Sequence, residues 1–369
     1  MQKQHRLNAT SLRALVLAAT VSVLAACGGG GSPSGMYGSD SRYAATLLVS
    51  DQAGAAQLDA QLSDPWDLAL GGGSALWVTN HGAASSAMFK ASDLSLPALV
   101  IAAPLNSAGS ARPTGVAFNP ANGFEVTLDG RTGVARFIVS SDGGTLSGWA
   151  PSLGLDRTVV AFDGTATGAV YTGLAMTPQG VESVLLAVDF HNRVVDTFAA
   201  DFTKLPPDAR FVDPDLPAGY APFGIAVQGD RIYITYASPD ASARTPQAGA
   251  GFGLVNVFDG AGRLVRRLIP AGGVLNAPWS MALAPTDFGA FSGALLVANV
   301  GDGTIAAFDA ASGRPLGSLT KPDGAVLAID GLHGIAFGNG AQGQPAHALF
   351  FTAGPQGGRH GVFGRIDLQ

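Results

Sequence analysis

The sequence predicts an all-β protein: a six-bladed β-propeller whose ring is closed by an N-terminal strand that completes the last blade. A tetrapeptide of small or Asp, apolar, Ala, apolar residues occurs six times, with first positions 48, 58, 51, 56 and 54 residues apart. A short strand repeated at such a period is typical of propeller blades. A surplus strand precedes the first copy, and the last repeat is one strand short. The copies begin at Asp67, Gly115, Gly173, Gly224, Ser280 and Gly334.

The tetrapeptide is interpreted as the innermost strand of each blade. Side chains alternate between the two faces of a strand, so its first and third residues share one face. Inner strands crowd around the propeller axis, where we expect only small side chains to fit, and the large apolar residues are expected to pack between blades. Six unrelated strands of a sandwich are the alternative, and the sixfold Ala disfavours them.

The N-terminus has the features of an export signal. Three basic residues precede an apolar stretch over residues 14–26, which is too short for a typical membrane span. The stretch ends in Leu24-Ala25-Ala26-Cys27, which resembles a bacterial lipobox. The resemblance implies a lipoprotein signal peptide over 1–26, with lipid on Cys27. Ordinary signal cleavage beside an incidental Cys is the alternative. We therefore expect an exported, membrane-anchored lipoprotein, periplasmic or at the cell surface.

Composition limits the chemistry of the mature chain. Cys27 is the only cysteine, so the folded domain has no disulfide, thiolate metal site or Cys nucleophile. Removal of residues 1–26 leaves 18 basic and 27 acidic side chains, a net charge of −9, which argues against a nucleic-acid partner. Residues 27–41 are rich in Gly and Ser and predict a flexible tether. The propeller is assigned to 42–369.

The remaining strands follow the repeats in order. A strand over 43–50 is expected to complete the sixth blade and so remove an exposed edge. Residues 237–251 form a long polar loop in blade four, which is either a functional lid or a disordered insertion. Residues 141–144 predict a hairpin turn. Second strands are expected at 75–80, 124–129, 184–189, 231–236, 294–299 and 348–352, and third strands near 87–90, 134–139, 193–198, 254–258, 304–308 and 361–367.

Parts of the repeat resemble a known family. Pro222-Phe-Gly-Ile-Ala-Val, followed by Arg231-Ile-Tyr-Ile-Thr-Tyr and Val255-Asn-Val-Phe-Asp-Gly, is similar to the NHL-type propeller repeat. The whole mature chain resembles an uncharacterised family of exported bacterial propellers, some members of which carry PEP-CTERM sorting tails. The resemblance implies the fold and export, and it brings no established activity.

One face of the predicted ring gathers polar and aromatic residues. Loops entering the first strand of each blade and loops leaving the second strand are expected to meet there, and propeller ligand sites usually lie on that face. Asp and Asn at strand ends also cap turns, which is the competing explanation. The candidate ligand rim is Trp66, Asp67, Asn80, His81, Asp129, Asp189, His191, Tyr236, Trp279, Asn299 and His333.

A divalent metal is one interpretation of this rim. Carboxylates and amides suit Ca²⁺, and His suits Zn²⁺. The candidate ligands of Ca²⁺ or another divalent metal are Asp67, Asp129, Asp189 and His191. A central metal resembles the lactonase-like propellers typified by gluconolactonase and regucalcin, in which Glu, Asn and Asp hold the ion. This chain has no Glu at a first-strand entry and so departs from that pattern.

Two function classes remain open. The first is a non-catalytic binding module of the cell envelope, whose partner is a protein, peptide, glycan or small molecule. The second is a metal-dependent hydrolase or lactonase, in which a metal activates water. An axial cluster of carboxylates would favour the second class, and aromatics with turn-capping Asp would favour the first. A quinone-cofactor dehydrogenase has less support, because no rim Lys or Arg is apparent. The sequence assigns no catalytic residue.

Overall fold

The computed structural model describes residues 41–73, 75–90, 99–103, 105–109, 111–177, 183–341 and 343–369. The chain divides into Met1–Met36 and Tyr37–Gln369, and the described residues all belong to the second unit. The predicted signal peptide, Cys27 and the tether up to residue 40 lie outside the described residues.

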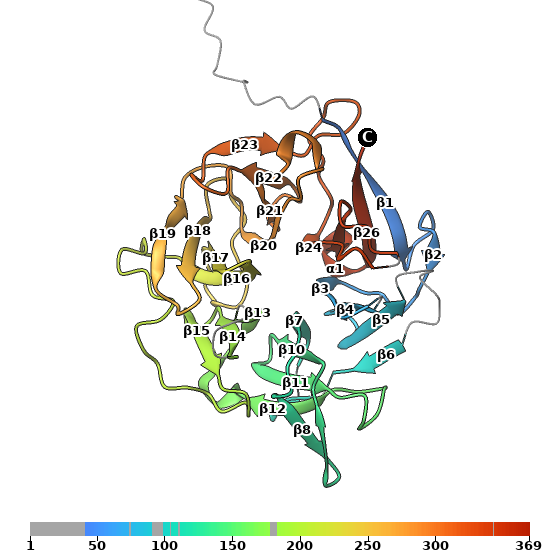
Figure 1. Cartoon of the computed structure of the whole chain (residues 1–369), viewed down its shortest axis with the longest axis vertical. Coiled ribbons are helices and arrows are strands. Elements are labelled where there is room, and N and C mark those ends of the chain that lie inside the picture. Colours follow the sequence, from blue (N-terminus) through green and yellow to red (C-terminus); the bar gives the residue numbers. More distant parts are fainter. Residues whose placement is uncertain are drawn as a thin grey trace, which may run out of the picture. The chain divides into compact units, whose positions relative to one another are not determined.

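The second unit is a ring of six antiparallel sheets around a central axis (Figure 1). This confirms the predicted six-bladed propeller. The innermost strands, which carry the tetrapeptides, are β3 (Pro65–Leu70), β7 (Pro113–Phe118), β13 (Tyr171–Met176), β16 (Ala221–Gln228), β20 (Pro278–Leu283) and β24 (Leu332–Phe337). The second strands are β4 (Ala75–Asn80), β10 (Phe137–Ser141), β14 (Leu185–Asp189), β17 (Arg231–Ala237), β21 (Leu295–Asn299) and β25 (Leu349–Ala353).

The outer strands complete each sheet. Third strands are β5 (Ser85–Lys90), β11 (Thr145–Trp149), β15 (Val194–Phe198), β18 (Leu254–Asp259), β22 (Ile305–Phe308) and β26 (Val362–Leu368). Fourth strands are β6 (Leu99–Ala102), β12 (Val159–Asp163), β19 (Leu264–Ile269), β23 (Pro315–Ser318) and β1 (Tyr43–Ser50). Short elements are β2 (Gln57–Leu58), η1 (Thr165–Thr167), η2 (Gly289–Phe291) and α1 (Pro355–Gly358). No helix among the described residues has the length and apolar character of a membrane span.

The N-terminal strand closes the ring as predicted. β1 pairs antiparallel with β26, from Tyr43 opposite Leu368 to Ser50 opposite Val362. The Ser50 hydroxyl also donates a buried hydrogen bond of 2.7 Å to the Gly361 carbonyl. The sixth sheet therefore contains strands from both ends of the propeller, which removes an exposed edge.

Every innermost strand contains an irregularity in its pairing with the second strand. Such a bulge frees a backbone N–H from the ladder. In four blades the first tetrapeptide residue donates this N–H to a hydroxyl of the second strand. The four pairs are Asp67 to Thr79, Gly115 to Ser140, Gly224 to Thr235 and Gly334 to Thr352, at 2.8–3.0 Å.

A hydroxyl also bridges each pair of neighbouring blades. At every one of the six junctions, a Thr or Ser donates to a backbone carbonyl of the next innermost strand. The six bonds are Thr79 to Thr114, Thr114 to Tyr171, Thr172 to Phe223, Thr235 to Trp279, Ser280 to Ile335 and Thr352 to Trp66, at 2.6–3.2 Å. We call this set the hydroxyl ring.

Six apolar clusters fill the same six junctions. At the first junction, Ala69 of one blade packs with Val116 and Phe118 of the next. The alanines thus pack at the blade junctions, as Ala117, Ala226, Ala282 and Ala336 also do, while Ala117, Ala175 and Ala226 line an axial cavity as well. Close approach of the inner strands explains the small residues, because a Cβ on Gly224 would lie 2.1 Å from the Trp279 carbonyl oxygen.

The second blade differs from its predicted strand assignment. β8 (Glu125–Leu128) and β9 (Arg131–Val134) form a separate two-stranded hairpin. The second strand is β10, which pairs with β7, and the third strand is β11. The expected strands at 124–129 and 134–139 are therefore corrected. Asp129 and Gly130, both at positive φ, form the tip of the inserted hairpin, as a tight hairpin turn requires.

The hydroxyl ring predicts a large effect from one isosteric change. Thr352→Val leaves the Gly334 N–H and the Trp66 carbonyl without the hydroxyl, and so should lower the free energy of unfolding by about 1–3 kcal/mol. Urea denaturation measures the change. Thr127→Val, at an exposed hydroxyl pair on the inserted hairpin, is the matched control and should have little effect. Equal losses in both variants would contradict a structural role for the ring.

Candidate functional site

Four of the predicted rim residues meet in one aromatic stack. The Trp66 ring lies between the imidazoles of His81 and His333, with centroid distances of 4.4 and 4.7 Å and interplanar angles of 20° and 17°. Trp279 meets Trp66 and His333 edge-on at 6.1 and 6.0 Å. We call these four residues, together with Asp64 and Asp142, the axial cluster.

An apolar floor supports the cluster. Phe190, Phe223 and Trp279 are almost completely buried and pack together with the half-buried Trp66. The Trp279 indole N–H donates to the Thr172 carbonyl at 2.9 Å. Because these residues come from four different blades, the position of the cluster depends on the closure of the ring.

His81 is held between two carboxylates. Its Nδ1 lies 2.9 Å from Asp64 Oδ2, and its Nε2 lies 3.3 Å from Asp142 Oδ2. Burial alone would lower the pKa of His81, but hydrogen bonds to Asp142 and Asp64 outweigh it and raise the pKa above its usual value. Carboxylates at both ring nitrogens favour the imidazolium form of His81, which links blade one to blade two.

The pKa values of the two carboxylates, Asp64 and Asp142, are shifted in the opposite direction from that of His81. Burial would raise the pKa of Asp64 and of Asp142, but the hydrogen bond from His81 outweighs it and lowers both values. Asp64 Oδ2 also accepts the Trp66 indole N–H at 3.2 Å. Gly354 makes room for this carboxylate, because a Cβ there would lie 2.0 Å from Asp64 Oδ1.

His333 differs from His81 in charge and in exposure of its nitrogen. Its Nδ1 donates to the Gly331 carbonyl at 2.9 Å, which places the lone pair on Nε2. Burial lowers the pKa of His333, so the ring is neutral near pH 7. Within the described chain, Nε2 has no hydrogen-bond partner, so it is the open acceptor of the cluster.

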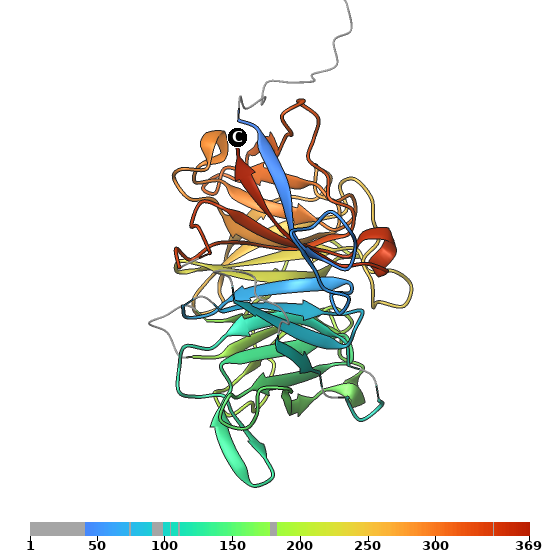
Figure 2. The same cartoon turned by 90° about the vertical axis from the view of Figure 1, so that its right-hand side faces the viewer.

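The long loop of blade four is ordered and reaches the cluster. Asp240 anchors its turn by accepting hydrogen bonds from the hydroxyls of Ser242 and Thr245. Arg244 Nη2 then donates to the Asp142 carbonyl of blade two at 2.7 Å. In Figure 2 this yellow loop and α1 project from the same side of the ring. The loop 237–251 makes defined contacts at Asp240 and Arg244, and its role as a lid stays a prediction.

The other predicted rim residues lie elsewhere, most of them in structural roles. The Asp67 carboxylate accepts the backbone N–H groups of Leu68 and Val116, both at 2.9 Å, and burial raises its pKa to about 7. It lines an axial cavity of about 240 Å³ between the inner strands. Asp189 accepts the N–H groups of Val170 and Asn192, both at 3.1 Å, which is turn capping.

The remaining rim residues do not join the cluster. Asn299 accepts the Asn276 N–H at 3.0 Å, and Tyr236 lines a cavity between blades three and four. Asn80 is fully buried, and its amide has no partner among the described residues. His191 packs beside Gly168, and Asp129 lies on the inserted hairpin.

The predicted metal ligands are not gathered. Asp67 lines the axial cavity, Asp189 caps a turn of blade three, and Asp129 is at a hairpin tip. Over the part of the chain that the structure describes, no group of three His, Cys, Asp or Glu side chains is placed to hold a metal ion. The residues present therefore do not fit the central metal of the lactonase-like propellers.

Sequence reasoning missed three members of the site: Asp64, Asp142 and Arg244. Asp142 was missed because the inserted hairpin was assigned as the second and third strands of blade two. A Ser or Thr lies one or two residues before the end of the second strand at Thr79, Ser140 and Thr352, but Thr127 has the same position in β8, so this pattern alone does not identify the correct strand. No sequence signal indicates that Arg244 of blade four contacts Asp142 of blade two.

The charge on His81 predicts a pH-dependent contribution to stability. Because its folded pKa is raised, the stabilisation is fully present below the unfolded value of about 6.5 and is lost as pH rises through the folded pKa. Asp64 and Asp142, with lowered pKa values, lose their contribution below about pH 4. The Tm difference between wild type and His81→Gln should thus be largest between about pH 4 and 6 and shrink in alkali.

Thermal melts across pH measure this difference. His347→Gln is the control, because His347 is exposed and lies 4.0 Å from its partner Asp287. The control difference should stay small at every pH. A His81→Gln difference that grows as pH rises would contradict an imidazolium between the two carboxylates.

Comparisons with known proteins show the family and the fold. No protein-family model matches the chain. Uncharacterized protein R648 of Acanthamoeba polyphaga mimivirus is 30% identical over 325 residues, which cover 86% of this chain and 78% of that protein. Uncharacterized protein L690 of the same virus is 31% identical over 293 residues, 76% of this chain and 75% of that protein.

Solved structures agree on the architecture. A streptogramin B lyase structure has a TM-score of 0.52 and 11% sequence identity, and the match covers 89% of this chain and 98% of that one. At this identity the likeness shows the fold alone. From the two viral relatives, we conclude that the chain belongs to the family of the mimivirus proteins R648 and L690.

Proposed function

We propose that this protein is an exported, lipid-anchored propeller that acts as a binding module of the cell envelope, and that the axial cluster is its ligand site. The observation that carries the binding proposal is the stack of Trp66 between His81 and His333, next to Asp142, whose carbonyl accepts a hydrogen bond from a loop of another blade. Aromatics with turn-capping Asp are the arrangement expected of a binding module.

The chemistry of the cluster indicates a ligand rich in hydrogen-bond donors. His333 Nε2 offers a lone pair, and Asp142, whose side chain is 28% exposed, has one further lone pair on each carboxylate oxygen beside its bonds to Arg112 N–H and His81. Both faces of the half-buried Trp66 are covered by imidazoles, so its edge supplies the apolar surface. A sugar combines hydroxyl donors with apolar C–H groups, so a glycan suits this surface better than an anion does.

Export and anchoring rest on the N-terminal sequence. The basic start, the apolar stretch over 14–26 and the lipobox-like Leu24-Ala25-Ala26-Cys27 support lipidation of Cys27. Several acyl chains on one terminus hold a protein stably at a membrane, whereas a single chain does not. The proposal places the propeller at the periplasmic or outer side of that membrane.

Cys27→Ala tests the anchor. In a bacterial host, the wild-type chain should incorporate an alkyne-labelled fatty acid and sediment with membranes, whereas Cys27→Ala should do neither. Cys27→Ser is a second variant that keeps the size of the side chain and should behave like Cys27→Ala. Membrane association that survives both substitutions would overturn the lipid-anchor proposal.

A glycan array tests the axial cluster as a binding site. A glycan that binds wild type should bind Arg244→Ala and His333→Ala at least about tenfold more weakly. Asp129→Ala, on the hairpin away from the site, should bind like wild type. Binding that is unchanged by both site variants would place the ligand elsewhere on the molecule.

One observation favours a second candidate, a hydrolase or lactonase without a metal. His333 has a lowered pKa and an Nε2 lone pair without a partner in the described chain, as a general base requires, whereas both nitrogens of His81 are bonded to carboxylates. In that case His333 Nε2 would take a proton from water. Turnover of esters or lactones that persists in chelator and is lost in His333→Gln would favour this candidate.

A further inference from the structure

Each innermost strand turns one edge of its backbone toward the propeller axis. In an antiparallel pair, the N–H and C=O groups of successive residues point alternately toward the partner strand and away from it. The Thr177 N–H bonds to the Val184 carbonyl, so the register of β13 and β14 turns the N–H of Leu174, three residues earlier, away from β14. Because the six sheets are separate, this edge has no partner strand, and the second residue of each tetrapeptide points its backbone groups to the axis.

The first tetrapeptide residue of one blade determines whether the N–H of the next blade is bonded. Asp67 Oδ2 accepts the Val116 N–H at 2.9 Å, and Ser280 Oγ accepts the Ile335 N–H at 3.0 Å. Where the first residue is Gly, it has no side chain that could accept. Three N–H groups to which no side chain of the described chain bonds belong to Leu174, Ile225 and Met281, which follow the blades of Gly115, Gly173 and Gly224. We call these three N–H groups the axial amides.

The axial amides border the axial cavity of about 240 Å³, whose lining comes from all six innermost strands. Asp67 is the only charged side chain in that lining. It bridges blades one and two, whereas the axial amides belong to blades three, four and five, across the axis of the ring (Figure 1). The cavity therefore has a carboxylate on one wall and three hydrogen-bond donors on the facing walls.

The aromatic floor of the axial cluster closes one end of this cavity. Trp66, Phe223 and Trp279 pack together, and each immediately precedes the first residue of a tetrapeptide. The cavity lining begins one position later, at Asp67 and Ser280, and continues toward the ends of the strands. A ligand therefore enters from the opposite face of the ring, so this cavity goes beyond the function proposed for the axial cluster.

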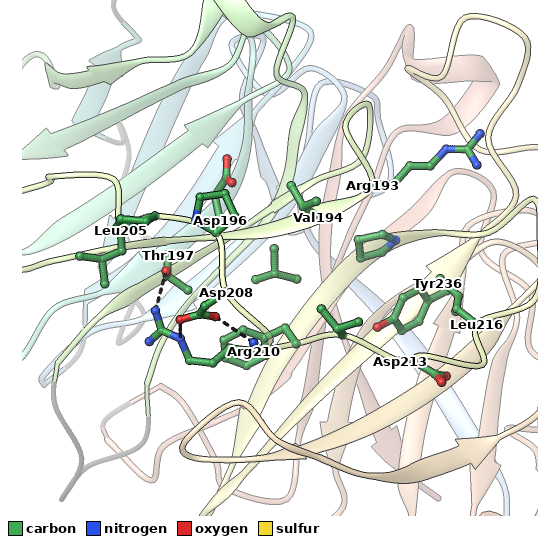
Figure 3. A pocket seen from close by; sticks show the side chains of 16 residues that line it. Arg193, Val194, Asp196, Thr197, Leu205, Asp208, Arg210, Asp213, Leu216 and Tyr236 are labelled. Atoms are coloured by element: carbon green, nitrogen blue, oxygen red, sulfur yellow. Dashed lines mark hydrogen bonds and ion pairs between the residues drawn. The ribbon is translucent and has the colours of Figure 1, made fainter.

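The Asp67 carboxylate lacks a cation, which distinguishes it from the carboxylates of another cavity. That cavity, of about 170 Å³ between blades three and four, is lined by three carboxylates that basic side chains neutralise (Figure 3). The pairs are Asp196 with Lys204, Asp208 with Arg210 and Asp213 with Arg267. Asp67 accepts two backbone N–H groups and meets no basic side chain in the described chain, and burial raises its pKa to about 7. A cation in the axial cavity would lower that pKa and be held by the charge.

The two polar walls therefore require opposite charges of one ligand. An anion alone would bond to the axial amides but be repelled by ionised Asp67, and a cation alone would leave the axial amides without acceptors. We propose that the axial cavity binds a small zwitterion of the amino-acid class, with its ammonium group on Asp67 and its carboxylate on the axial amides. The carbonyls that face the axis accept the remaining ammonium protons. The cavity is smaller than the 300–1,000 Å³ typical of small-molecule sites, which limits the ligand to this size.

A ligand series tests the charge pattern by isothermal titration calorimetry. The probes are glycine, β-alanine and 4-aminobutyrate, which carry the two charges at increasing separation. The matched halves, which lack one charge, are methylamine and acetate, ethylamine and propionate, and propylamine and butyrate. At least one zwitterion should bind at least about tenfold more tightly than either of its halves. Equal binding of a half would overturn the proposal. Absence of saturable binding at about 10 mM would also overturn it and leave the cavity to water.

Asp67→Ser removes the charge and keeps a hydroxyl like the one that Ser280 provides at the same position of blade five. The variant should bind the zwitterion at least about tenfold more weakly. Wild type should also release about half a proton on binding at pH 7, because the ammonium group ionises Asp67. Enthalpies in buffers of different ionisation heat measure this release, which Asp67→Ser should lose. Asp129→Ser, at the exposed hairpin tip, is the matched control and should behave like wild type. Unchanged affinity in Asp67→Ser would contradict the ammonium site.

Residue-resolved hydrogen exchange tests the axial amides without a substitution. In the free protein, they should exchange faster than the Ile335 amide, which has a side-chain acceptor. The zwitterion should slow the axial amides and leave the Ile335 amide nearly unchanged. Axial amides that are as protected as the Ile335 amide in the free protein, or that the zwitterion does not slow, would overturn the proposal.

Discussion

The hydroxyl ring is the constraint on which the rest of the propeller depends. Each of its six hydrogen bonds joins a buried or, at Ser280, a half-buried hydroxyl to a carbonyl of the next innermost strand. One such bond contributes only about 0.5–1.5 kcal/mol net, less than the apolar clusters beside it. Its larger effect is on register, because a slipped strand would leave both a buried N–H and a buried carbonyl without partners.

The same bonds fix the position of the candidate site. Three of the carbonyls that accept ring hydroxyls belong to Trp66, Phe223 and Trp279. The side chains of these residues form the floor and the centre of the axial cluster. The backbone at each aromatic residue is therefore held by the neighbouring blade, and the site is as rigid as the closure of the ring. Rigidity of this kind lets a shallow aromatic surface bind without a large ordering cost.

The fold was predictable because it depends on short, repeated, local rules. Each tetrapeptide combines a small residue, where inner strands approach closely, with apolar residues that fill a junction. The tetrapeptides that begin at Gly224 and Gly334 both show this pattern. The site was less predictable because it depends on contacts between distant segments. Asp142 and Arg244 are 102 residues apart. No local pattern indicates that the 237–251 loop of blade four contacts the turn between β10 and β11 of blade two.

The inserted hairpin shows where local rules fail. Residues 124–134 have the alternation and the Asp-Gly turn of an ordinary strand pair, so they compete with β10 for the second position of the blade. The hydroxyl pattern does not decide between them, because Thr127 in β8 has the same position before the strand end as Ser140 in β10. In the structure Ser140 accepts the Gly115 N–H and β10 pairs with β7, whereas β8 pairs with β9. Likewise, Pro206 and Pro207 explain the missing strand of blade three, since they lack the donors that a further strand needs.

The charges of the axial cluster give its two sides different properties. On one side of Trp66, His81 lies between the carboxylates of Asp64 and Asp142, which raise its pKa, and the guanidinium of Arg244 donates to the Asp142 carbonyl. Buried ion pairs contribute little net stability because desolvation offsets their attraction. The main effect of the His81 side is therefore to hold the Trp66 indole and the 237–251 loop in place. On the other side, His333 is neutral and its Nε2 accepts no bond within the described chain. A ligand that donates a hydrogen bond therefore gains most by approaching from the His333 side, with the fixed Trp66 edge as its apolar neighbour.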